Sequence, residues 1–81
     1  MLQPRLMAVR PLPDYKLELV YETGEQGTFD VAPYISGSWF GQLKDPLYFK
    51  TVHLVSDGAG LEWANGQDIA PHELFESCVP A

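Results

Sequence analysis

The sequence has few of the residues that cross-link small proteins. It contains one cysteine, Cys78, and two histidines among 81 residues. A single cysteine cannot form an internal disulfide, and no Cys/Cys or Cys/His cluster offers a structural zinc site. A chain of this length buries only about 60–65% of the surface that its unfolded form exposes, so its core is thin. Because small domains without cross-links often gain stability by association, we expect a homo-oligomer or a protein partner.

Basic charge and long apolar runs are also scarce. Five Lys and Arg residues face 11 Asp and Glu residues, which gives a net charge of −6. Direct nucleic-acid binding needs a basic face, so this balance argues against it. No apolar run approaches the ~20 residues of a membrane span, and the first residues lack the apolar core of a signal peptide. A lone cysteine is typical of a reducing compartment. We therefore expect a cytoplasmic protein that binds neither nucleic acid directly nor a membrane.

What the chain does contain is alternation of apolar and polar residues in its first third. Apolar residues make up 46% of the sequence, enough for a globular core. Residues 5–10 predict a strand near a sheet edge, which the prolines at positions 11 and 13 end. Residues 15–22 alternate with the period of a half-buried strand, Gly24 supplies a turn, and residues 26–31 form the return strand.

A second hairpin is predicted between residues 52 and 63. Residues 52–55 form its first strand, Asp57–Gly58 is a favourable turn pair, and Leu61 and Trp63 lie on the return strand. Asn65–Gly66 then predicts another tight turn.

The middle and the end of the chain are typical of short helices. Between the two hairpins, Asp45 is a cap and Pro46 the first residue of a helical turn. Pro71 likewise begins a C-terminal helix, and we expect Asp68 to accept hydrogen bonds from its free N–H groups. The fold is therefore predicted to be a single α+β domain over residues 1–81. It consists of two antiparallel β-hairpins, an N-terminal strand, helical turns in the middle and a short C-terminal helix.

The densest aromatic cluster lies between the hairpins and supplies the interface candidates Trp39, Phe40 and Tyr48. Trp39 and Phe40 stand in a segment bounded by glycines. Aromatic residues there either pack into the core or anchor an interface with another protein. The sequence leaves both interpretations open.

A small ligand-binding domain or enzyme is the alternative hypothesis, with a pocket between the hairpins and the last helix. Its candidate residues are Asp30, His53, Asp68 and His72. His72 and Glu76 share a helix face at a spacing that can hold a metal, but a site needs a third ligand. We predict an ordinary solvated pair instead, and no metal site.

Catalytic machinery is not recognisable in the sequence. Glu73 and Glu76 stand close to Cys78, and nearby carboxylates raise the pKa of a thiol, which disfavours a catalytic thiolate. No serine lies in a nucleophile-elbow pattern, and there is no Gly-rich phosphate loop. We therefore expect neither an enzyme nor a bound cofactor.

Four segments carry a resemblance to a known family: "VRPLPDYKLELVYETGE", "GTFDVAPYI", "LKDPLYFKTVHL" and "LEWANGQDIAPHEL". The chain resembles the uncharacterised family catalogued as domain of unknown function 2442. The resemblance implies a compact α+β domain of bacterial origin, encoded beside a second small protein in a toxin–antitoxin-like layout. It implies no catalytic residues. Ala70 stands where relatives tend to have Ser, which predicts a weakened helix cap. On these grounds we expect a non-enzymatic interaction or regulatory module whose partner is a small toxin-like protein.

Overall fold

Residues 3–80, which the computed structural model describes, form two antiparallel sheets and three short α-helices. The larger sheet has the strand order β1-β2-β3-β6, and the smaller one pairs β4 with β5. The strands are β1 (Leu6–Leu12), β2 (Lys16–Tyr21), β3 (Gln26–Asp30), β4 (His53–Val55), β5 (Gly60–Glu62) and β6 (Val79–Pro80). The helices are α1 (Gly37–Phe40), α2 (Pro46–Phe49) and α3 (Pro71–Ser77), with 3₁₀ turns at Ala32–Tyr34, Gly41–Lys44 and Ser56–Gly58.

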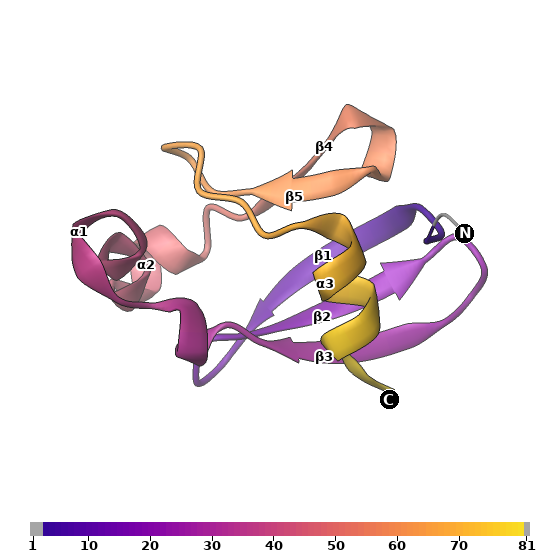
Figure 1. Cartoon of the computed structure of the whole chain (residues 1–81), viewed down its shortest axis with the longest axis horizontal. Helices are drawn as coiled ribbons and strands as arrows, with labels where there is room; N and C mark the ends of the chain where they lie inside the picture. Colours follow the sequence, from indigo (N-terminus) through magenta and orange to yellow (C-terminus); the bar gives the residue numbers. More distant parts are fainter. Residues whose placement is uncertain (1–2, 81) are drawn as a thin grey trace.

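This arrangement confirms the predicted α+β class. Both predicted hairpins form, β2 with β3 and β4 with β5. Helix α3 packs on the larger sheet through contacts such as Phe75 against Tyr21, whose ring centroids lie 5.2 Å apart. In Figure 1, α1 and α2 gather at one end of the molecule, away from the ends of the chain.

Alternation along β2 decides which face of the larger sheet is buried. Leu17, Leu19 and Tyr21 are buried, as the sequence pattern predicts, and Phe29 and Val31 extend the same face. On the other face Glu18 bonds Arg10 of the neighbouring strand at 3.0 Å. A period of two therefore places an apolar face toward α3 and a charged face outward.

The first strand is longer than the sequence predicts. It lies at a sheet edge, as expected, but it runs through Pro11, which pairs with Leu17, and ends at Leu12. An edge strand has a neighbour on one side only, so a proline whose missing N–H points to the open side costs no ladder bond. The prediction that Pro11 ends the strand was wrong for this reason.

A last strand follows α3 and has no counterpart in the sequence prediction. Val79 and Pro80 form β6, which pairs with Thr28 and Gly27 of β3. Two residues, one of them a proline, carry no alternation signal. Only the packing of α3 brings the end of the chain back beside β3.

The two predicted helix caps differ in outcome. Asp45 caps α2, because its carboxylate accepts a hydrogen bond from the N–H of Leu47 at 3.0 Å. Helix α3 instead follows Ala70, whose side chain makes no cap bond, so the cap predicted for Asp68 was wrong. Asp68 instead pairs with Glu62 in an isolated antiparallel β-bridge.

The core lies between the larger sheet, the smaller sheet and α3. Trp63 is fully buried at its centre, and its indole N–H donates to the carbonyl of Phe49 at 2.9 Å. The other buried apolar residues come from every layer: Leu6, Leu17, Leu19, Tyr21, Phe29, Val31, Leu43, Phe49, Leu61, Ile69 and Leu74. Within residues 3–80, no helix combines the length and the apolar character that crossing a membrane requires.

Gly58 provides a test of how the smaller sheet meets β1. It has φ +90°, and a Cβ at this position would lie 2.1 Å from the carbonyl oxygen of Leu6. Gly66 has φ +100° but open space around it. We expect Gly58→Ala to lower the free energy of unfolding by about 3 kcal/mol or more and Gly66→Ala by only about 1–2 kcal/mol. Urea denaturation measures both; equal losses would contradict the close approach of Gly58 to β1.

Candidate functional site

The segment from Trp39 to Phe49, here called the helical segment, is fixed by a buried polar network. Gln67 is fully buried, and its side-chain amide donates to the carbonyl of Trp39 at 3.0 Å. The hydroxyl of Tyr48 donates to the side-chain oxygen of Gln67 at 2.6 Å and accepts from the N–H of Asn65 at 2.8 Å. A buried amide with its bonds made rigidifies its surroundings. The helical segment is therefore held from within.

The three interface candidates occupy different environments on this segment. Trp39 is 49% exposed, whereas Phe40 and Tyr48 are half-buried against the core. Leu47, which the sequence reading did not single out, is 76% exposed. The segment thus presents two large apolar side chains to solvent while its other aromatic residues pack inward.

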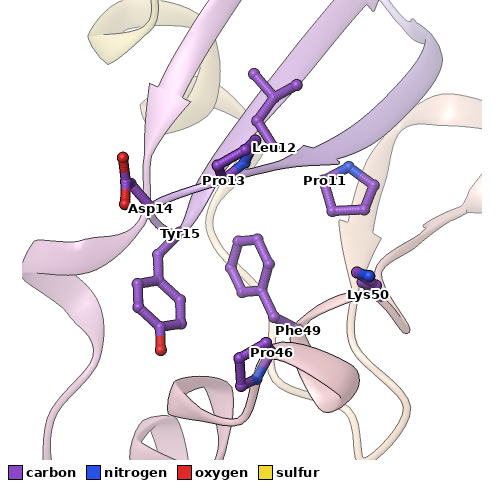
Figure 2. A pocket seen from close by; sticks show the side chains of 8 residues that line it. All are labelled: Pro11, Leu12, Pro13, Asp14, Tyr15, Pro46, Phe49 and Lys50. Carbon is purple, nitrogen blue, oxygen red and sulfur yellow. The ribbon is translucent and has the colours of Figure 1, made fainter.

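A recess lies beside the helical segment, between the β1–β2 turn and α2. We call it the proline recess, and its volume is about 560 Å³. Its lining residues are Pro11, Leu12, Pro13, Asp14, Tyr15, Pro46, Phe49 and Lys50. Figure 2 shows the ring of Phe49 pointing from α2 toward the Pro11–Pro13 segment, with Asp14 and Lys50 on opposite sides. Proline rings have fixed backbone angles, so these walls are preformed.

Backbone strain occurs at the turn that forms one side of the proline recess. Asp14 and Tyr15 both have positive φ, 65° and 60°. Asp tolerates this region, but a bulky residue there costs roughly 1–2 kcal/mol. Tyr15 is held by a hydrogen bond from its hydroxyl to the carbonyl of Lys44 and by an edge contact with Phe49, with ring centroids 5.5 Å apart. The surrounding structure therefore maintains a strained residue at the recess, as often occurs at functional sites.

The lining of the proline recess is mainly apolar. Its titratable residues are Asp14, Tyr15 and Lys50. Its walls are mainly hydrocarbon, with one carboxylate and one ammonium group at the sides. Such a surface suits an apolar side chain or ring with polar groups at its ends.

Two of the predicted ligand residues have local structural partners. Asp30 accepts a hydrogen bond from the N–H of Ala32 at 3.0 Å, which stabilises the turn after β3. His53 lies 3.0 Å from the carbonyl of Thr51 through Nδ1 and 3.3 Å from the carboxylate of Glu62 through Nε2. These contacts are those of a turn and of a cross-strand pair.

The other two predicted ligand residues, Asp68 and His72, are exposed. None of the four ligand candidates lines the proline recess or the second recess, which lies beside α3. In the part of the chain that the structure describes, no three His, Cys, Asp or Glu residues are grouped to hold a metal.

Cys78 follows α3 and is half-buried, and its thiol donates to the carbonyl of Phe75 at 3.3 Å. Burial, followed by the charge of Glu25, raises the pKa of this thiol. The predicted rise of the Cys78 pKa is confirmed, but the carboxylate that contributes to it is Glu25 of the β2–β3 turn, and not Glu73 or Glu76. Glu73 instead accepts a hydrogen bond from Tyr34, and this bond raises the pKa of the tyrosine.

Sequence reasoning missed Gln67 and the residues of the proline recess. Gln67 is a single polar residue after the Asn65–Gly66 turn, and no periodic pattern around it predicts that it is buried. The prolines were interpreted only as strand and helix boundaries. The sequence signal for this recess is that three prolines, at positions 11, 13 and 46, each lie within a few residues of Tyr15 or Phe49.

The comparisons with known proteins address the family of the chain. A family model described as "Protein of unknown function (DUF2442)" matches residues 6–80. The chain belongs to this family. The match confirms the resemblance and covers every helix and strand of the structure. Searches of curated proteins and of solved structures found no significant match.

Tyr48 and Tyr34 provide a matched test of the buried network. Tyr48→Phe leaves the side-chain oxygen of buried Gln67 without its donor, so we expect a loss of about 1–3 kcal/mol in unfolding free energy. Tyr34→Phe removes a bond to Glu73, which water reaches more easily, and should cost about 0.5–1.5 kcal/mol. Denaturant unfolding of both variants measures the difference. A smaller loss for Tyr48→Phe than for Tyr34→Phe would contradict the role of Gln67.

Proposed function

We propose that this protein is a non-enzymatic interaction module that binds another protein through the helical segment and the adjoining proline recess. The observation that carries the proposal is the exposure of Trp39 and Leu47 on a rigid segment. Large aromatic and apolar side chains on preorganised backbone are the usual anchors of protein interfaces. A small domain that exposes them on one segment is suited to bury them against a partner.

The partner that fits best is a small protein with an apolar anchor side chain. The proline recess would receive that side chain, and its mainly hydrocarbon lining supports this role. The net charge of −6 favours a partner with basic groups around its anchor. The same charge argues against direct binding to nucleic acid, so any regulatory role that we propose would act through protein contact.

The toxin–antitoxin-like layout implied by the family resemblance supports a toxin-like protein as this partner. Cys78 as a free thiol supports a reducing, cytoplasmic setting. A second copy of the chain is the other partner that we consider, since the core of so short a chain is thin.

Trp39→Ala and Leu47→Ala test the proposed interface without disturbing the fold. The network bond at Trp39 uses its backbone carbonyl, which the alanine variant retains. We expect each variant to weaken binding of a captured partner about 30-fold, which corresponds to about 2 kcal/mol. Affinity capture from the native host identifies the partner, and calorimetry with the purified pair measures the affinity.

Met7→Ala is the matched control, since Met7 is 65% exposed on β1, outside the helical segment. It should bind like the wild type. Light scattering after size exclusion tests the second copy as partner, and there Trp39→Ala should shift an oligomer toward monomer. A strictly monomeric protein without a partner, or binding that ignores both alanine variants, would refute the proposal.

A further inference from the structure

Two side chains of opposite charge stand on opposite sides of the proline recess. Asp14 belongs to the β1–β2 turn, and Lys50 directly follows α2. They are the charged residues of a lining that is otherwise built from proline, leucine and aromatic side chains. Figure 2 shows the ring of Phe49 in the space between them. The recess thus has an apolar floor, an acidic side and a basic side.

Neither charge is used by the fold. Asp14 and Lys50 are both exposed. The salt bridges found among residues 3–80 join other side chains, in a cross-strand pair of the larger sheet and in one of the smaller sheet. Both charges therefore remain available to groups on a segment that enters the recess.

The backbone that carries these two charges is fixed on both sides. Tyr15, next to Asp14, is held by the hydrogen bond of its hydroxyl to the 3₁₀ turn before α2. Phe49, next to Lys50, is held by the bond of its carbonyl to the indole of Trp63. The fold therefore decides on which side of the recess each charge stands.

Opposite charges on two sides give the recess a direction that its apolar walls lack. An apolar anchor side chain alone can enter from a segment that runs either way across the surface. In an extended segment, the residues two positions before and after the anchor point to the same side as the anchor, roughly 7 Å away from it. If these residues are charged, one direction gives two attractive contacts, whereas the reverse places like charges together.

We propose that the proline recess binds an extended segment of the partner in one direction, with an apolar anchor between a basic residue beside Asp14 and an acidic residue beside Lys50. This inference rests on the proposed function, since it names the chemistry of the segment that the recess receives. The net charge of −6 attracts a basic partner from a distance, whereas these two charges orient the segment at contact.

The test uses three capped peptides with a leucine anchor: Ac-Lys-Gly-Leu-Gly-Glu-NH2, its reverse Ac-Glu-Gly-Leu-Gly-Lys-NH2, and the uncharged Ac-Gln-Gly-Leu-Gly-Gln-NH2. Nuclear magnetic resonance titration of the whole chain measures each affinity from the backbone amides of Tyr15 and Phe49. Exposed ion pairs are weak, so we expect one charged peptide to bind about fivefold more tightly than its reverse. In about 1 M salt this preference should disappear while binding of the leucine anchor persists, because salt screens exposed charges.

Two double variants locate the preference in the recess without changing the net charge. Asp14→Asn with Lys50→Gln should bind both charged peptides equally, and asparagine tolerates the positive φ of position 14. Asp14→Lys with Lys50→Asp should prefer the other peptide. The neutral pair keeps the test decisive if the exchanged pair folds poorly.

Arg10→Gln with Glu18→Gln is the matched control. It also removes one acidic and one basic group, but from a salt bridge on the outer face of the larger sheet, outside the lining of the recess. It should keep the wild-type preference.

The outcomes separate this inference from the proposed function. Equal binding of the two charged peptides by the wild type, or a preference that persists in the neutral pair, would overturn the direction and leave the recess as an apolar anchor site. Absence of binding by all three peptides would overturn the direction together with the anchor role of the recess.

Discussion

The structure depends on one line of aromatic packing that runs from Trp63 through Phe49 to Tyr15. The indole N–H of Trp63 donates to the carbonyl of Phe49, and the two rings lie 5.8 Å apart. Phe49 in turn meets Tyr15 edge-on. These three residues come from the end of the smaller sheet, from α2 and from the first turn of the larger sheet. A thin core without cross-links thus joins its separate parts through large aromatic side chains, and the polar atoms of Trp63 and Tyr15 are both hydrogen-bonded.

The same line of packing shapes the surface on which we base the functional proposal. Phe49 is both a core residue and a lining residue of the proline recess. Because its ring is held by Trp63 and Tyr15, the recess is rigid, and the network around Gln67 holds the neighbouring helical segment. Trp39 and Leu47 are then left exposed on a surface that cannot collapse to cover them. The second recess, beside α3, has a different lining, with Glu25 and Glu76 as its charged groups.

Much of the fold follows from local rules that the sequence displays. Leu17, Leu19 and Tyr21 alternate with polar residues, so one face of β2 had to be buried. Asp45 before Pro46 predicted a capped helix start, and the structure has that cap. The failures occur where a distant partner decides. Pro11 remains in a strand because β1 is at a sheet edge. Asp68 pairs with Glu62 in a β-bridge and does not cap α3. Strand β6 forms because α3 returns the chain to β3.

By itself, then, the sequence determined the class of fold, the two hairpins and the start of α2, because each rests on periodicity or turn chemistry within a few residues. The family instead follows from a resemblance that extends over residues 6–80. The candidate site was predictable only in part: the aromatic segment was visible, but neither recess was. Only the tertiary structure decided that Trp39 is exposed while Trp63 is buried, that Gln67 lies in the core and that the hydroxyl of Tyr21 lacks a hydrogen-bond partner within residues 3–80. Burial and hydrogen-bond partners depend on contacts between residues far apart in the chain, which local patterns do not encode.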